Sequence, residues 1–214
     1  MNVSTTRNRL HIARLHAQDA ASRIRKCFTN AGSLVFYASP NVPTYGELSI
    51  QLFTLYDTVR ADIWAATDEH SDALHRTDVI SARLRDVYRT APELFPRALP
   101  AGGALRLEIA EALRPVPELG VDGLVDLSES LRLTWLDLGE IVHDAAIVGR
   151  SHEHTAGALD DLADEDADDL LYEMAGAVAS QVNNDGREAQ IRFLLTQLGE
   201  DGARTALFDF AAGI

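Results

Sequence analysis

Four carboxylates at matched spacing are the residues of this sequence whose types could do chemistry together. Asp137 and Glu140 lie three residues apart, and so do Asp166 and Asp169. If both segments are helical, each pair projects from one side of its helix. Carboxylate oxygens are ligands that Mg²⁺ prefers in proteins, together with the phosphates of a substrate. Two such helices facing each other could therefore hold Mg²⁺, which would activate water for attack on a triphosphate.

The segment that carries these acids, about residues 130–180, resembles the MazG-type all-α nucleotide pyrophosphohydrolases. The signature of that family is E-x-x-E on one helix and E-x-x-D on the next, and Asp137, Glu140, Asp166 and Asp169 stand at the matching positions. The resemblance implies a Mg²⁺-dependent enzyme that cleaves nucleoside triphosphates to monophosphate and pyrophosphate, as a helical oligomer. The sequence departs from the family pattern at Asp137 and Asp166, where glutamate is usual.

Other catalytic motifs are incomplete in this sequence. Glu140 and His143 have the Glu-x-x-His spacing of di-iron helix bundles, which need a second such motif that the sequence lacks. His143 and Asp144 form a dipeptide found in metal-dependent phosphohydrolases, which also need an earlier His and a later Asp. No nucleophile elbow, P-loop or dinucleotide-binding glycine motif is present. We therefore assign no catalytic residue, and no cofactor other than the Mg²⁺ of the pyrophosphohydrolase hypothesis.

Two long antiparallel amphipathic helices, over residues 121–149 and about 155–182, would position the acids. Apolar residues recur at helical spacing in both segments. The predicted core stripe of the first helix is Leu124, Leu127, Leu131, Trp135, Leu138, Val142 and Ala145. The predicted stripe of the second is Leu159, Leu162, Ala163, Leu170, Met174 and Val178. Most of the acids lie opposite these stripes, so solvent-facing carboxylates are the competing interpretation of the metal motif.

The remaining segments also favour helices. Helical spacing predicts further helices over residues 5–28, 44–63, 71–89, 104–114 and 187–198. The short stretch 34–37 is the one strand-like segment, and an isolated strand cannot build a sheet. We therefore predict an all-α fold, a multi-helix bundle of about seven to eight helices. Residues 1–214 would form a single helical domain, with possible halves at 1–95 and 101–214 sharing one core.

The charge of the chain is strongly negative, with a formal net charge of −14 from 33 acids and 19 bases. A protein with this charge repels the phosphate backbone, so we expect no broad binding of nucleic acid. Basic residues gather instead in the first 30 residues, where they are candidate partner contacts: Arg7, Arg14, Arg23, Arg25 and Lys26. With no complete catalytic set, the favoured function is a non-catalytic one, through contacts with a protein partner or self-assembly into a homo-oligomer. The Mg²⁺-dependent pyrophosphohydrolase is the alternative.

The cellular setting follows from cysteine content and hydropathy. Cys27 is the only cysteine, so an intrachain disulfide cannot form, which suits a reducing compartment. No apolar run approaches the ~20 residues that a membrane span needs. The N-terminal residues lack the apolar stretch of a signal peptide. We therefore expect a soluble cytoplasmic protein that makes no contact with membranes.

Overall fold

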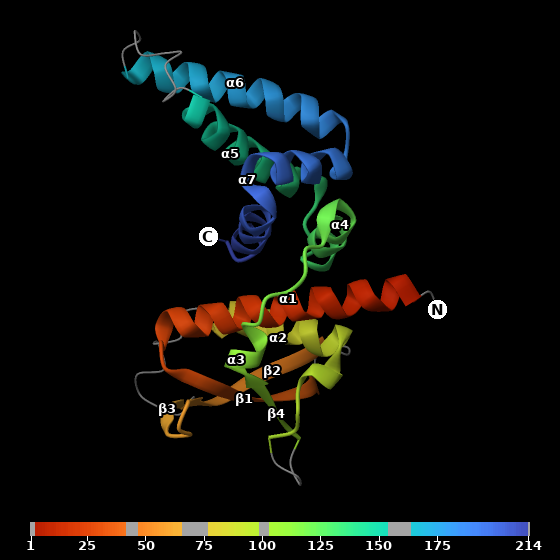
Figure 1. Cartoon of the computed structure of the whole chain (residues 1–214), viewed down its shortest axis with the longest axis vertical. Coiled ribbons are helices and arrows are strands. Elements are labelled where there is room, and N and C mark those ends of the chain that lie inside the picture. Colours follow the sequence, from red (N-terminus) through yellow and green to blue (C-terminus); the bar gives the residue numbers. More distant parts are fainter. Residues whose placement is uncertain (1–2, 42–46, 66–76, 99–102, 154–163, 214) are drawn as a thin grey trace. The chain divides into compact units, whose positions relative to one another are not determined.

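The computed structural model describes residues 3–41, 47–65, 77–98, 103–153 and 164–213 (Figure 1). Two compact units make up the chain, Met1–Pro117 and Glu118–Ile214. The division falls between Pro117 and Glu118, later than the boundary between the possible halves 1–95 and 101–214. Each unit has its own elements and is described by itself.

The N-terminal unit contains a four-stranded antiparallel sheet, so the prediction of an all-α helical bundle is wrong. Its strands lie in the order β3-β2-β1-β4. The elements of this unit, in chain order, are α1 (Val3–Cys27), β1 (Ala31–Asn41), β2 (Glu47–Asp57), β3 (Asp62–Ala65), α2 (Thr77–Thr90), the 3₁₀ turn η2 (Pro92–Leu94), β4 (Ala104–Glu108) and α3 (Ile109–Ala112). The strand-like stretch 34–37 is part of β1, which pairs with the next strand, β2, and with β4 much further along the chain.

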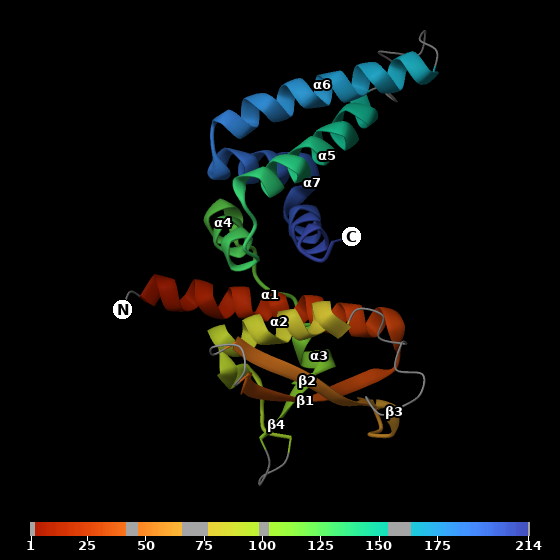
Figure 2. The ribbon, with the colours of Figure 1, turned by 180° about the vertical axis from the view of Figure 1, so that it is seen from behind.

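Helices α1 and α2 lie side by side on one face of this sheet (Figures 1 and 2). Small side chains on α1, Ala13, Ala17 and Ala20 among them, are buried in the core of the unit. The strands contribute large side chains such as Leu34 and Phe36 to the same core. Phe95, just after η2, packs edge-on against Phe36 with ring centroids 4.9 Å apart. The unit is thus a two-layer fold with its core between helices and sheet.

Strands β2 and β3 replace the helix predicted over 44–63. In β2 the register shifts at Phe53: Val35 pairs with Thr54, but Phe36 pairs with Leu52. A bulge of this kind adds one residue to a strand and reverses the inside–outside alternation beyond it. Leu52 and Leu55 are both buried although they lie three residues apart. The bulge therefore gave the strand buried residues at the three-residue spacing that is typical of a helix.

One more correction and one close contact concern strands β4 and β1. The helix predicted over 104–114 is strand β4 followed by the single helical turn α3. Gly32 in β1 lies so close to β2 that a Cβ atom there would be 2.4 Å from the carbonyl oxygen of Asp57. Glycine is required at this position because any side chain would collide with the backbone of the neighbouring strand.

The C-terminal unit is helical. Its elements are α4 (Gly120–Ser130), α5 (Trp135–Glu153), α6 (Asp164–Asn184) and α7 (Arg187–Phe210). The helix predicted over 121–149 is therefore two helices, and α7 continues beyond 198 across a kink at Gly199, where φ is 67°. The first part of the helix predicted over 155–182 lies outside the described residues. Among the described helices, none is both long and apolar enough to cross a membrane.

Candidate functional site

Helix α5 begins at a reciprocal cap that fixes where its first side chains point. The backbone N–H of Thr134 donates to the Asp137 carboxylate at 2.6 Å, and the Asp137 N–H donates to Thr134 Oγ1 at 3.2 Å. This is a capping box, with aspartate in the place that glutamate more often takes. The cap starts a new helix after residues 131–134, so Trp135 and Leu136 stand in its first turn. Both side chains are 59% exposed.

Two polar side chains of α7, of which Gln190 is buried, hold this helix start in place. The Arg187 guanidinium donates to Ser128 Oγ in α4 and to the Leu133 carbonyl, both at 2.7 Å. The Gln190 amide, fully buried, donates to the Trp135 carbonyl at 3.0 Å. These bonds satisfy backbone carbonyls of the turn before α5 and of its first residue, and they fix the segment from which Trp135 projects.

Helices α5 and α6 lie side by side (Figures 1 and 2). An open groove of about 690 Å³ is lined by residues of both helices. We call this the α5/α6 groove. Its α5 side consists of Trp135, Leu136, Gly139, Glu140, His143 and Asp144, and its α6 side of Tyr172, Gly176, Ala179, Ser180, Asn183 and Asn184. Several of these residues are small, so the backbones approach and the larger side chains stand out as walls. A Cβ atom at Gly139 would lie 2.8 Å from Asn183 Nδ2, which shows how close the two helices come.

The walls of the α5/α6 groove combine aromatic and acidic groups. Tyr172 is 63% exposed and meets the His143 ring edge-on, with ring centroids 4.8 Å apart. Glu140 and Asp144 are exposed on the same helix as His143. Among the described residues that line the groove, none is Lys or Arg. The groove therefore offers apolar contact area inside a negative potential.

The four carboxylates of the Mg²⁺ hypothesis have different surroundings in the structure. Asp137 caps α5, whereas Glu140 lines the α5/α6 groove and Asp169 is exposed on α6. Asp166 belongs to α6, but its side chain lies outside the described part of the chain. Within the side chains that are described, no group of three or more His, Cys, Asp or Glu could hold a metal ion. The pyrophosphohydrolase resemblance stays a prediction.

The N-terminal bases, predicted as partner contacts, do not form one patch. The Arg23 guanidinium is buried and donates to both oxygens of Asp19, at 2.9 and 3.0 Å. Arg25 is partly buried and donates to the Thr29 carbonyl at 2.9 Å. Arg14 and Lys26 are exposed. The side chain of Arg7 lies outside the described ones.

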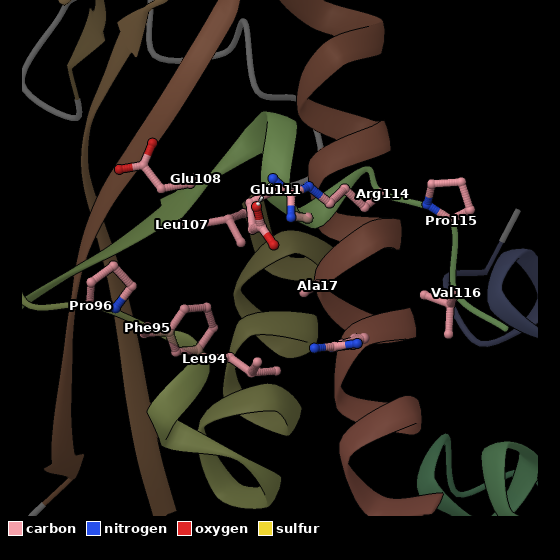
Figure 3. Close-up of a pocket in the computed structure, with 12 residues that line it drawn as sticks. Ala17, Leu94, Phe95, Pro96, Leu107, Glu108, Glu111, Arg114, Pro115 and Val116 are labelled. Atoms are coloured by element: carbon pink, nitrogen blue, oxygen red, sulfur yellow. Dashed lines mark ion pairs between the residues drawn. The ribbon is translucent and has the colours of Figure 1, made fainter. Parts of the chain in front are cut away.

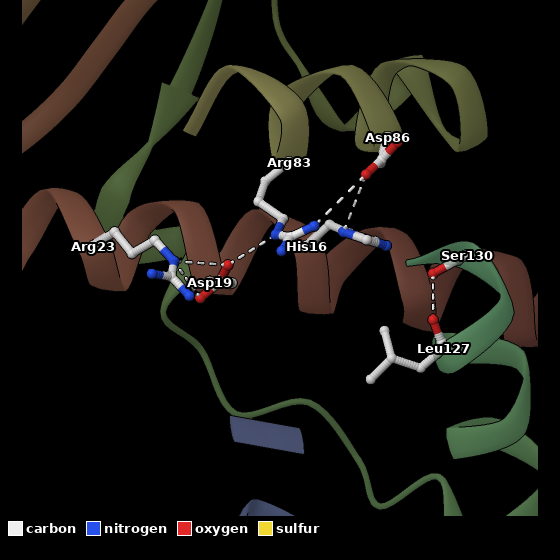
Figure 4. A network of polar contacts seen from close by, with 7 residues as sticks. All are labelled: His16, Asp19, Arg23, Arg83, Asp86, Leu127 and Ser130. Atoms are coloured by element: carbon white, nitrogen blue, oxygen red, sulfur yellow. Dashed lines mark hydrogen bonds and ion pairs between the residues drawn. The ribbon is translucent and has the colours of Figure 1, made fainter. Parts of the chain in front are cut away.

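Arg23 belongs to a buried polar network between α1 and α2 (Figure 4). Asp19 also accepts a hydrogen bond from Arg83 Nε at 3.0 Å, and Asp86 lies 3.7 Å from Nδ1 of the fully buried His16. Burial, and then the positive charge of Arg83, lower the pKa of His16 from 6.5 to about 3. His16 is therefore neutral at neutral pH, and the network is a structural one that ties the two helices together.

The sequence did not identify the exposed aromatic residues. A continuous helix over 121–149 would place Trp135 in its core stripe, but the helix starts anew at this residue. Leu170 and Met174, which the spacing predicts in the core of α6, are 36% and 38% exposed. One signal was available: Thr134-Trp-Leu-Asp137 has capping-box spacing, which marks a helix start and places Trp135 outside the buried stripe.

Comparisons of the chain with family models, with curated proteins and with solved structures found no match. The function therefore has to be argued from the chemistry of the α5/α6 groove and of the N-terminal unit.

Proposed function

We propose that this protein is a non-catalytic binding protein whose α5/α6 groove receives a basic amphipathic helix of a partner protein. The observation that carries this proposal is the exposure of three large apolar side chains, Trp135, Leu136 and Tyr172, on the walls of one groove. Single exposed apolar residues are ordinary on protein surfaces, but a group of them around a concavity is typical of an interaction site. Trp and Tyr are also the residues that most often dominate binding energy in protein interfaces.

The charge around the groove selects the partner. Residues 135–149 contain three acids and no Lys or Arg, and residues 164–184 contain acids but likewise no Lys or Arg. Asp168, Asp169 and Glu173 are exposed on α6, in addition to the acids that line the groove. A partner with Lys or Arg beside its apolar residues gains complementary electrostatics, and an acidic partner is repelled.

The shape of the groove favours a helix as the bound element. The groove follows α5 from Trp135 to Asp144, a length of about 14 Å at the 1.5 Å rise of a helix. Two packed helices leave a linear depression into which a third helix can lay its apolar stripe. About 14 Å corresponds to two to three turns of the bound helix, enough for anchors at i, i+3 or i+4, and i+7.

The test uses a designed peptide as probe, a short amphipathic helix of Leu and Arg, titrated into the full chain. Trp64 is buried and Trp135 is exposed, so quenching of tryptophan emission by acrylamide reports mainly on Trp135. We expect the peptide to bind and to shield Trp135 from the quencher. Trp135→Ala and Tyr172→Ala, followed by calorimetry, should each weaken binding roughly tenfold or more.

Two controls make this test specific. Phe53→Ala removes an aromatic side chain that is 49% exposed on the sheet of the other unit, and it should leave the affinity unchanged. The same peptide with Glu in place of Arg should bind much more weakly. The proposal fails if Trp135→Ala binds the basic peptide as tightly as the parent protein, or if the acidic peptide binds equally well.

A further inference from the structure

The N-terminal unit contains a cavity of about 310 Å³ that the proposed function does not use (Figure 3). It is bounded by α1, by the segment around η2, and by β4, α3 and the residues that follow α3. Figure 3 shows Ala17, Leu94, Leu107 and Val116 around it, together with charged side chains. A concave site of this size, mostly apolar with a few polar groups, is the usual form of a small-molecule site, at the lower end of its volume range.

The charged side chains around the cavity are not equivalent. Glu111 is paired with Arg114, with 2.8 Å between carboxylate and guanidinium, and Glu108 lies 3.5 Å from Arg106. Arg14 also lines the cavity, but within the described part of the chain it has no ion pair or hydrogen bond. The cavity therefore offers one guanidinium whose donors meet no acceptor among the described residues.

We propose that this cavity binds a small monocarboxylic acid with an apolar body. The carboxylate would pair with Arg14, whose planar guanidinium matches the two oxygens of a carboxylate. The apolar body would lie against Leu94, Leu107 and Val116. An amine of the same shape would find its charge facing Arg14, and a short acid such as acetate would leave the apolar surface uncovered. The site shares no residue with the α5/α6 groove, so this inference goes beyond the proposed function.

The probe is octanoate, titrated into the full chain by isothermal calorimetry, beside octylamine and acetate at the same concentrations. We expect saturable binding of octanoate at one site, and none of the other two. Arg14 is exposed, so Arg14→Gln should leave the fold intact. It should weaken the binding of octanoate roughly tenfold or more, since a charge-assisted hydrogen bond is lost. Arg14→Lys keeps the charge but not the paired donors, so its affinity for octanoate should lie between those of the parent protein and Arg14→Gln.

Lys26→Gln is the matched control, because Lys26 is an exposed cation on the same helix that does not line the cavity. It should leave the affinity for octanoate unchanged, and so should Trp135→Ala in the α5/α6 groove. The inference is overturned if octanoate shows no saturable binding, if octylamine binds as tightly, or if Arg14→Gln binds octanoate like the parent protein. Loss of octanoate binding in Trp135→Ala would also overturn it, since the acid would then occupy the groove.

Discussion

At the scale of single residues, the buried network between α1 and α2 carries the most unusual chemistry. Asp19 accepts hydrogen bonds from two buried guanidinium groups, those of Arg23 and Arg83. Arg83 also lies 4.0 Å from Asp86, so the network sets two cations against two anions, and removing one partner of such a set leaves an uncompensated charge. A neutral imidazole at position 16 avoids adding a third positive charge beside Arg83. Burial, and then the positive charge of Arg83, lower the pKa of His16.

His16 should make the stability of the protein depend on pH. Its pKa is about 3 in the folded protein against 6.5 in the unfolded chain, so unfolding takes up a proton between these values. The contribution of the neutral His16 to the free energy of unfolding is fully present above pH 6.5 and is lost as the pH falls toward 3. From pH 8 to pH 5 we expect a loss of about 2 kcal/mol in the free energy of unfolding from this group. Urea denaturation at a series of pH values measures it.

The variant His16→Gln separates this effect from the titration of carboxylates. Glutamine is neutral at every pH, so the difference in stability between parent and variant should shrink, or change sign, between pH 8 and pH 5. A difference that stays constant over this interval would show that His16 is not the residue whose protonation destabilises the fold. Every other residue is the same in both proteins, so the comparison isolates position 16.

At the scale of elements, local spacing predicted some helices well and missed the sheet. The helices predicted over 5–28 and 187–198 are confirmed as parts of α1 and α7, because each has apolar residues at helical spacing that neighbouring elements cover. One pairing of the sheet, β1 with β4, joins segments far apart in the chain and leaves no local pattern, whereas β2 pairs with its chain neighbours β1 and β3. The bulge at Phe53 then removed the alternation that identifies a half-buried strand.

The candidate site could be predicted only in part, for a similar reason. The sequence placed Glu140 and Asp144 on the outer face of a helix, and both are exposed there. It could not show that Asn183 approaches Gly139, because two antiparallel helices can pack in several registers and the sequence does not fix which residues meet. The groove exists only because of such contacts. Its aromatic walls are visible once the helix is known to start at Trp135.

Two glycines of the α5/α6 groove give a matched pair of variants. A Cβ atom at Gly176 would meet nothing within 4 Å, so Gly176→Ala should raise the free energy of unfolding by about 0.5–1 kcal/mol through helix propensity. At Gly139 the same change collides with Asn183 Nδ2, and Asn183 is held by a 2.9 Å bond from Gln190. Gly139→Ala should therefore lower stability by about 1 kcal/mol despite the same gain in propensity.

Thermal and urea denaturation of the two variants test this prediction directly. Changes of opposite sign in the free energy of unfolding would support close packing of α5 against α6 at Gly139 and open space at Gly176. If Gly139→Ala were as stabilising as Gly176→Ala, the contact between Gly139 and Asn183 would not exist in solution. Because both residues line the same groove, peptide binding by each variant also shows whether the groove keeps its shape.

At the scale of the whole molecule, the net charge of −14 raises the question of where electrostatic attraction for a basic partner originates. A uniformly distributed negative charge attracts any basic peptide to every surface. A local field, produced by acids around the α5/α6 groove, attracts the peptide to one site. The two cases respond alike to added salt, since salt screens exposed charges over about 10 Å at 0.1 M and about 3 Å at 1 M. Salt alone therefore cannot separate them.

Two glutamates that differ only in position can separate them. Glu140→Gln and Glu93→Gln each remove one negative charge from an exposed site, so they change the net charge equally. Only Glu140 lines the α5/α6 groove. We expect affinity for the Leu–Arg peptide to fall with rising NaCl concentration in all three proteins. Glu140→Gln should bind several-fold more weakly at low salt and show a shallower salt dependence, because a nearby charge acts more strongly than a distant one. Equal losses in the two variants would mean that net charge, and not the groove, attracts the peptide.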